Sequence, residues 1–317
     1  MSAVASTRHV LRVADLDNGE LAALLDLAAR MKAAPFDWTH ALPGRSVACY
    51  FDKPSTRTRV SMEAACWRLG ALPVMLRREE LQLRRGEPIA DTGRVLSGYC
   101  AAIAVRTTRQ ADLETLAAAA TVPVLNALSE EHHPCQAIGD LLTLRERFGS
   151  LRGLRLGYVG DGNNVAHSLL EACGMAGMSV TLACPPGYWP KARVVERAAA
   201  LARARGGRIA VVSEPAEAVA GVNVVYTDVW VSMGDEAQRE QRRSELAHFH
   251  IDAALMAEAD PAAIFMHCLP AHRGEEVSSA VIDGPASAVW QQAANQLPVE
   301  QALIYALVTG DWAGERA

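Results

Sequence analysis

The stretch RSVACYFDKPSTRTRVSMEAACWRLG, residues 45–70, decides the fold class, because an apolar run leads directly into a helical pattern. Arg57 and Arg59 fall in the first turn of that helix, where unpaired backbone N–H groups already carry positive partial charge. A docked anion explains the two arginines, since N–H groups, hydroxyls and a guanidinium bind anions together. The alternative is an ordinary helix start, capped by Ser55 and flanked by solvated arginines.

The same order of strand and helix repeats along the chain, which predicts an α/β fold of two doubly wound parallel-sheet domains. Further buried strands are expected at AAIAVRT, VPVLNAL, LRLGYVG, SVTLACP, RIAVVS, NVVYTDVW and AIFMHCLP. GSLRG at 149–153 marks the division, so we expect one domain over residues 1–150 and a second over 151–289. A C-terminal helix within about 290–317, clearest at Val299–Thr309, is expected to pack back on the first domain.

The composition is that of a globular protein: of 317 residues, 50% are hydrophobic and 21% are charged, with a formal net charge of −5. This acidity argues against nucleic acid as the partner, and no apolar run has the length of a membrane span. The opening residues lack the apolar core of a signal peptide, so we expect a cytoplasmic location. Seven widely spaced cysteines without a CxxC pair are expected to be reduced thiols there.

Polar clusters follow the expected strands directly: DKPSTRTR, RTTRQ, SEEHHPCQ, GDGNN, TDVWVSMGDE and HCLPAHRG. In open parallel sheets, ligands bind beyond the carboxyl ends of the strands. We therefore expect these clusters to build a single ligand site between the two domains.

The cluster GDGNN at 160–164 has two interpretations. Gly160-x-Gly162 between a strand and a helix is the start of a dinucleotide fingerprint, which would indicate an NAD-dependent oxidoreductase. However, Val165 takes the third glycine position, and the next strand does not end in an acidic residue. Asn163 and Asn164 fit contacts to a small ligand better, or a tight turn with asparagines in left-handed conformations.

Metal-ligand residue types lie in two of the clusters: His132, His133, Cys135, His267, Cys268 and His272. Their spacing matches no closed zinc site, so we expect no structural metal. Cys268 ends a strand, and is expected either as an inert buried thiol or as part of a site. Asp228 also ends a strand, and is expected either to cap the next helix or to accept from an ammonium ligand.

Taken in order, the motifs resemble the ornithine branch of the aspartate/ornithine carbamoyltransferase family, from His9 to Leu307. They are STRTR at 55–59, RRGEPIADTGRVLS at 84–97, VRT around Arg106, HPCQ at 133–136, GDGNN, DVWVSMG at 228–234 and HCLPAHRGEEV at 267–277. The resemblance implies transfer of the carbamoyl group of carbamoyl phosphate to the δ-amine of L-ornithine, giving L-citrulline and phosphate, in arginine biosynthesis. It also implies no metal or nucleotide cofactor, and a homotrimer or an assembly of trimers.

The resemblance also implies residue roles, with the first half as the carbamoyl-phosphate-binding domain and the second as the ornithine-binding domain. The phosphate contacts are Ser55, Thr56, Arg57, Thr58 and, from a neighbouring subunit, Gln82. Arg106, His133 and Thr58 polarise the carbamoyl carbonyl, and Gln136 binds the carbamoyl amide. Ornithine is held by Asn164, Asp228, Ser232 and Met233. Cys268 and the Leu269 carbonyl lie by the attacking amine, so the implied catalytic residues are Arg106, His133, Asp228 and Cys268.

One departure concerns the donor site. The family segment Glu-Asn-Arg-Leu-His reads Ala294-Asn295-Gln296-Leu297-Pro298 here, so Gln296 replaces an arginine that binds carbamoyl phosphate. Glutamine brings neither the charge nor the bidentate fork of arginine. A lost charged contact costs about 1.5–3 kcal/mol, or roughly ten-fold to a hundred-fold in affinity. Arg84, where the family has glycine, is a candidate replacement cation.

The departure leaves two alternatives to the ordinary reaction. One is a related carbamoyltransferase that acts on a different amine. The other is a non-catalytic homologue with impaired carbamoyl-phosphate binding. The retained Arg57, His133, Asp228 and Cys268 argue against the second, because both halves of the chemistry are present.

Overall fold

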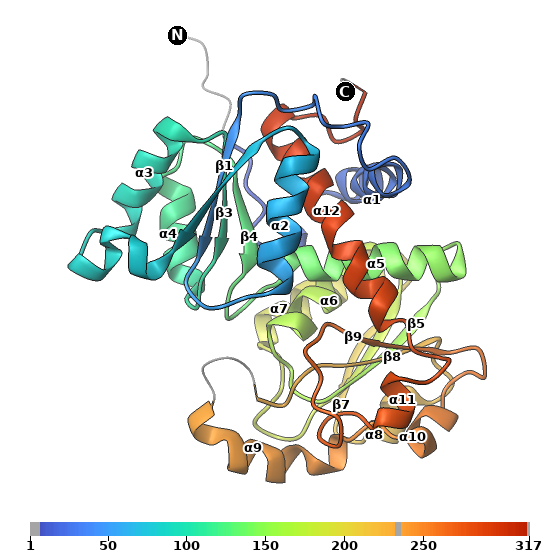
Figure 1. The fold of residues 1–317 in the computed structure, drawn as a ribbon. Helices are drawn as coiled ribbons and strands as arrows, with labels where there is room; N and C mark the ends of the chain where they lie inside the picture. Colours follow the sequence, from blue (N-terminus) through green and yellow to red (C-terminus); the bar gives the residue numbers. More distant parts are fainter. Residues whose placement is uncertain (1–6, 232–235, 316–317) are drawn as a thin grey trace. The chain divides into compact units, whose positions relative to one another are not determined.

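The computed structural model describes residues 7–231 and 236–315, and these divide into two compact units (Figure 1). Unit 1 consists of Met1–Leu142 and Asn295–Ala317, and unit 2 of Thr143–Ala294. Each unit contains one parallel sheet with helices packed against it. The predicted α/β class with two parallel sheets is therefore confirmed.

Unit 1 is built on a four-stranded sheet of order β2-β1-β3-β4 among its described residues. The strands are β1 (Ser46–Phe51), β2 (Leu72–Arg77), β3 (Ala102–Arg106) and β4 (Val124–Leu128). The helices are α1 (Asn18–Ala33), α2 (Arg57–Arg68), α3 (Ile89–Tyr99) and α4 (Gln110–Ala119), with parts of α5 (Pro134–Phe148) and α12 (Val289–Thr309). All residues of β3 are buried, as expected of a central strand covered on both faces.

The final helix, α12, packs into unit 1, as predicted. The rings of Tyr305 and Trp38 meet edge to face at 5.5 Å between centroids, and Tyr305 donates a hydrogen bond to Asp311. The helix begins at Val289, ten residues before the clearest part of its sequence pattern, and Pro298 lies inside it. Proline removes a helical hydrogen bond, but Val289 and Gln296 are buried, and this packing holds the helix through the proline.

Unit 2 is built on a five-stranded parallel sheet of order β7-β6-β5-β8-β9 among its described residues. The strands are β5 (Arg155–Val159), β6 (Ser179–Ala183), β7 (Ile209–Val212), β8 (Val224–Thr227) and β9 (Ile264–His267). The helices are α6 (Asn164–Met175), α7 (Ala192–Ala204), α8 (Pro215–Val219), α9 (Arg239–Leu246), α10 (Ala253–Ala257) and α11 (Ser279–Ile282). Val159, Val225 and Phe265 from three of the strands join its core.

Strand order reverses once in each sheet, and these reversals position the polar loops. In unit 1 the reversal lies between β1 and β3, whose last residues, Phe51 and Arg106, are paired. In unit 2 it lies between β5 and β8, which precede GDGNN and DVWV. Ligands of doubly wound sheets bind at such points.

Two further observations concern the chain as a whole. None of the helices in the described ranges is long and apolar enough to cross a membrane. All seven cysteines are free thiols, and six of them are buried.

Candidate active site

Helix α2 begins without the serine cap that the sequence allowed. Its N-cap residue is Thr56, whose side chain makes no capping hydrogen bond, and its first turn contains no acidic residue. Ser55 is half-buried, Arg57 is exposed, and the Thr58 side chain faces inward with 3% of the residue exposed. The first turn thus keeps its positive partial charge and hydroxyls for an anion.

Thr58 links three distant parts of unit 1. Its hydroxyl oxygen accepts a hydrogen bond from Nη1 of Arg106 at 3.4 Å and another from Nε2 of Gln296 at 3.3 Å. Arg106 ends β3 and Gln296 lies on α12, and both are buried. The structure therefore brings together three of the residues predicted to bind carbamoyl phosphate.

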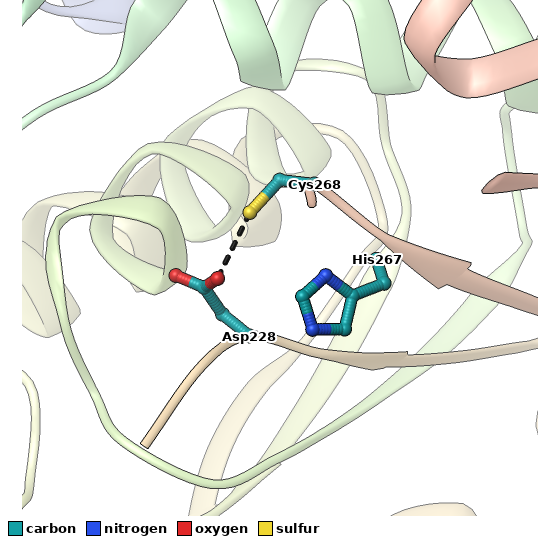
Figure 2. A group of neighbouring side chains, drawn as sticks. All are labelled: Asp228, His267 and Cys268. Carbon is teal, nitrogen blue, oxygen red and sulfur yellow. Dashed lines mark hydrogen bonds between the residues drawn. The ribbon is translucent and has the colours of Figure 1, made fainter. Parts of the chain in front are cut away.

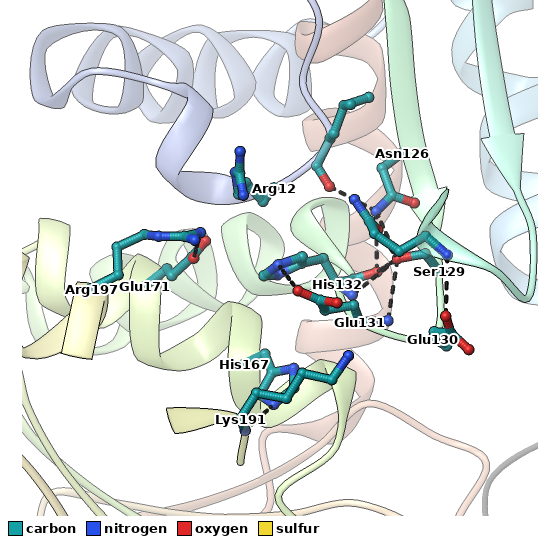
Figure 3. Close-up of polar contacts among 12 residues, drawn as sticks. Arg12, Asn126, Ser129, Glu130, Glu131, His132, His167, Glu171, Lys191 and Arg197 are labelled. Atoms are coloured by element: carbon teal, nitrogen blue, oxygen red, sulfur yellow. Dashed lines mark hydrogen bonds and ion pairs between the residues drawn. The ribbon is translucent and has the colours of Figure 1, made fainter. Parts of the chain in front are cut away.

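His133 directly precedes α5 and follows a hydrogen-bonded loop after β4. Figure 3 shows Asn126, Ser129 and His132 of that loop. The amide of Asn126 donates to the His132 carbonyl and to the Ser129 hydroxyl, each at 3.3 Å. That hydroxyl in turn accepts from the backbone N–H of His132 at 3.0 Å. These hydrogen bonds among buried polar groups order the backbone that leads into His133.

His133 itself is buried, and its pKa is lowered to about 3, first by burial and then by the charges of Arg106 and Arg57. At neutral pH its imidazole is uncharged and can donate one N–H. One turn later, Nε2 of Gln136 donates to Asp140 at 2.8 Å, which fixes the orientation of its amide.

In unit 2, the asparagines of GDGNN have different roles. Asn163 is the N-cap of α6: its side-chain oxygen accepts from the N–H groups of Val165 and Ala166 at 3.0 and 3.2 Å. Its backbone is extended, so the alternative of a left-handed asparagine turn is wrong at this position. Asn164 is half-buried at the first position of the helix, and the family resemblance implies an ornithine contact for it.

Close packing accounts for the second glycine of this cluster. A Cβ on Gly162 would lie 2.4 Å from the backbone nitrogen of Pro190, so no side chain fits there. Gly162 also donates its N–H to the Tyr188 carbonyl at 2.8 Å. The glycine thus serves a loop contact rather than the approach of a pyrophosphate, and the dinucleotide interpretation loses its support.

Asp228 lies at the centre of a second cluster (Figure 2). Its carboxylate accepts from Nδ2 of Asn163 at 2.7 Å, from Sγ of Cys268 at 2.9 Å and from the Val229 N–H at 2.8 Å. The parallel pairing of Thr227 with His267 places Asp228 and Cys268 beside each other. Asp228 is oriented by side chains of its neighbours, so it is not the simple helix cap that the sequence allowed.

His267 is occupied by structural contacts. Its Nδ1 accepts from the Leu269 N–H at 2.9 Å, so its Nε2 carries the proton and faces Glu276 at 3.1 Å. Asp228, His267 and Cys268 offer ligand atoms within 4.8 Å of one another, but no nitrogen of His267 is left for a cation. Leu269 has a φ of 60°, an uncommon value outside glycine that is typical of strained functional loops.

The other histidines and thiols of the sequence pattern serve separate contacts. Nε2 of His132 lies 3.6 Å from Glu131, whereas Cys135 is fully buried and its pKa is raised by that burial. His272 lies 3.8 Å from Glu276, measured from Nδ1 to Oε2.

Some predicted residues are not brought into either cluster. Gln82 and Arg84 are exposed in a 3₁₀ turn, Gln82–Arg85. Ser232 and Met233 lie outside the described residues. The predicted roles of these residues, and of all the other site residues, stay predictions.

Sequence reasoning missed Arg242, which ties three loops of unit 2 together. Its Nε donates to the Trp230 carbonyl at 2.6 Å, its guanidinium pairs with Asp161, and it lies 4.9 Å from the ring centroid of Tyr188. These partners follow β8, β5 and β6 respectively. The residue is only 8% exposed, and a buried arginine on the otherwise polar helix α9 has no signature in a single sequence.

Comparisons with known proteins cover almost the whole chain. Residues 8–146 match the family model of the carbamoyl-P binding domain, and residues 152–307 match the Asp/Orn binding domain, both of aspartate/ornithine carbamoyltransferase. A protein named ornithine carbamoyltransferase from Acidothermus cellulolyticus is 53% identical over 98% of both chains. Another of that name, from Symbiobacterium thermophilum, is 50% identical over 94% of this chain and 96% of its own.

Solved structures agree with these sequence matches. The ornithine carbamoyltransferase from Pyrococcus furiosus superposes with a TM-score of 0.92 at 46% identity, covering 96% of this chain and 98% of its own. The one from Campylobacter jejuni has a TM-score of 0.90 at 34% identity, with coverages of 96% and 100%. The chain therefore belongs to the aspartate/ornithine carbamoyltransferase family.

Proposed function

We propose that this chain transfers the carbamoyl group of carbamoyl phosphate to the δ-amine of L-ornithine, giving L-citrulline and phosphate in arginine biosynthesis. The observation that carries the proposal is the similarity, at about half identity and nearly full length, to relatives named ornithine carbamoyltransferase. The two polar clusters at the strand reversals support it, since each fits one of the two substrates.

Carbamoyl phosphate is held by the cluster of unit 1. The phosphate lies at the start of α2, against Ser55, Thr56, Arg57 and Thr58, because this turn carries positive partial charge and no acidic residue. Gln136, whose amide is fixed by Asp140, binds the carbamoyl amide. Gln296 brings no charge to this cluster, and its amide donates to Thr58 and Glu300.

The carbonyl oxygen becomes an oxyanion as the amine attacks, and Arg106, His133 and Thr58 stabilise it. Neutral His133 donates an N–H without competing for a proton, because its pKa lies far below neutrality. Arg106 provides the positive charge in a buried setting, where charge stabilisation is stronger than in water.

Ornithine is held by the cluster of unit 2. Asp228 accepts from the α-ammonium, and Asn164 binds the α-carboxylate together with Ser232 and Met233 by analogy to the family. Cys268 and the Leu269 carbonyl lie beside the δ-amine and orient it. The amine must be neutral to attack, although its pKa in water resembles that of lysine, and desolvation on binding lowers it. The leaving phosphate accepts the released proton, so no dedicated general base is required.

The proposal extends to assembly, compartment and domain roles. Unit 1 is the carbamoyl-phosphate domain and unit 2 the ornithine domain, with the division after Leu142 rather than at the expected residue 150. A homotrimer, or an assembly of trimers, would allow Gln82 and Arg84 to reach the phosphate of a neighbouring subunit. Light scattering tests this, because a monomeric active enzyme would contradict it. The seven free cysteines support a cytoplasmic location.

The deciding experiment measures ureido product from carbamoyl phosphate with ornithine, lysine, putrescine and N-acetylornithine in parallel. We expect product with ornithine but not with putrescine or N-acetylornithine, because Asp228 recognises a free α-ammonium that putrescine lacks and N-acetylornithine blocks. Asp228→Asn is the matched variant: it keeps the size of the side chain and should raise the KM for ornithine strongly. Preference for another amine would support the related transferase, and no product with any amine would refute the enzymatic proposal.

A further inference from the structure

Glu300 is a fully buried carboxyl group that the mechanism above does not use. It lies one helical turn after Gln296 on α12, and its Oε1 accepts a hydrogen bond from Nε2 of Gln296 at 3.1 Å. The same Nε2 donates to the Thr58 hydroxyl at 3.3 Å. Glu300 thus stands behind the proposed donor site, connected to it through one amide group.

The hydrogen-bond inventory of Thr58 shows why this connection matters. A hydroxyl has one hydrogen to donate and two lone pairs to accept with. Nη1 of Arg106 and Nε2 of Gln296 fill both lone pairs, and neither nitrogen can accept. The Thr58 hydrogen is therefore left to point at a third group, which is what an anionic oxygen of the substrate requires.

This arrangement depends on which end of the Gln296 amide faces Thr58. If the amide were reversed, its carbonyl oxygen would accept the Thr58 hydrogen and remove it from the substrate. Oε1 of Glu300 opposes the reversal, because it accepts a hydrogen bond from the NH₂ end at 3.1 Å and would lose that bond if the carbonyl end faced it. Burial raises the pKa of Glu300 to about 8, against the opposing effect of hydrogen bonds from Ser61 and Gln296. The carboxyl group is thus largely protonated at pH 7: it keeps Oε1 as the acceptor toward Gln296, and it barely repels a phosphate dianion.

We propose that Glu300 is a positioning residue for carbamoyl phosphate: acting through Gln296, it makes Thr58 an obligate donor to the substrate. The inference rests on the proposed function and deepens it. Gln296, in the place of a family arginine, then serves by orienting a neighbour rather than by binding the phosphate directly.

The test begins with three variants and steady-state kinetics for both substrates. Glu300→Met removes the acceptor at similar length, and should raise the KM for carbamoyl phosphate about three- to ten-fold, the value of one hydrogen bond, with the KM for ornithine unchanged. Glu300→Gln retains an acceptor oxygen and should restore a near wild-type KM. Gln301→Met is the matched control: Gln301 is equally buried on the same helix, and its loss should leave the KM for carbamoyl phosphate unchanged.

A double-mutant cycle separates positioning from general packing. In the Gln296→Ala background the connection is already broken, so Glu300→Met should cause no further change in the KM for carbamoyl phosphate. If Glu300→Met does not fold, Glu300→Leu removes the same acceptor. An unchanged KM in Glu300→Met, or an equal rise in both backgrounds, would overturn the inference while the wild type still forms citrulline. A wild type that forms no citrulline would instead overturn the proposed function.

Discussion

Replacing Arg242 by methionine tests how the ornithine cluster is held in place. The guanidinium bonds to the Trp230 carbonyl at 2.6 Å and pairs with Asp161, and the two side chains of the pair are only 10% and 13% exposed. Removing one partner of a buried ion pair costs about 3–5 kcal/mol, because the other charge stays buried. Because Asp161 keeps some exposure to water, we expect a loss in the free energy of unfolding at the lower limit of this range, about 3 kcal/mol.

The expected loss in the free energy of unfolding should appear as a lower melting temperature, and the loosened loops should appear as a higher KM for ornithine. For a unit of about 150 residues, 1 kcal/mol corresponds to roughly 2–4 °C, so calorimetry should show a fall of about 6–12 °C. The loops that carry Asn163 and Asp228 lose their tether, so the KM for ornithine should rise by about ten-fold, the equivalent of 1.4 kcal/mol. The KM for carbamoyl phosphate should not change, because its residues lie in unit 1.

Arg243 on the same helix provides the control. It pairs with Glu275 at 2.8 Å, but its side chain is 48% exposed, and exposed ion pairs are worth only about 0–1 kcal/mol. Arg243→Met should therefore lower the melting temperature by no more than about 4 °C. Our reasoning would be refuted if the two variants had the same melting temperature, or if Arg242→Met raised the KM values of both substrates equally.

Three further predictions concern unit 1. His133 should stay neutral in the free protein from pH 8 to 5, because its pKa is lowered to about 3; its NMR signal, assigned by its loss in His133→Asn, should not move over this range. Glu300→Gln should raise the melting temperature above that of wild type at pH 9 and not at pH 4. The folded-state pKa of Glu300, about 8, exceeds its ordinary value of 4.5. Wild-type stability therefore falls as the pH rises from 4.5 to about 8, whereas the glutamine variant has no proton to lose there. Gln296→Arg should lower the KM for carbamoyl phosphate ten-fold or more if the missing charge limits donor binding, and an unchanged KM would show that it does not.

The strands and their polar ends could be predicted because both signals are local. The buried runs that became β1, β3, β5 and β8 are continuous and the residues after them are polar, so the strands and the positions of the polar loops at their carboxyl ends could be read from the sequence. The continuity of α12 through Pro298 could not be predicted in the same way. Pro298 argues locally against a continuous helix, and the packing of residues on both sides of it decides otherwise.

Among the site residues, too, those with a local sequence signal could be predicted, and those that depend on long-range contacts could not. Asp228 and Cys268 were recognisable because each directly follows a strand. The pairing of those two strands, which places the residues side by side, was visible only in the structure. Asn163 caps α6 and also donates a hydrogen bond to Asp228. The second of these roles is a contact across 65 residues of sequence, which no local pattern encodes. Glu300 stands in the apolar pattern of residues 299–308, and a single charged residue there was the only available signal of a buried carboxyl group.

The discontinuity of unit 1 has a consequence for synthesis on the ribosome. Thr58 and Gln296 are 238 residues apart, and all of unit 2 is translated between the two segments of unit 1. At roughly 5–20 residues per second, those intervening residues take about 8–30 s to emerge. Unit 2 can fold in that interval, whereas the nascent first segment waits with the surface that will receive Tyr305 uncovered. The growing chain is therefore without its complete carbamoyl-phosphate cluster, and needs protection from aggregation, until α12 has left the ribosome.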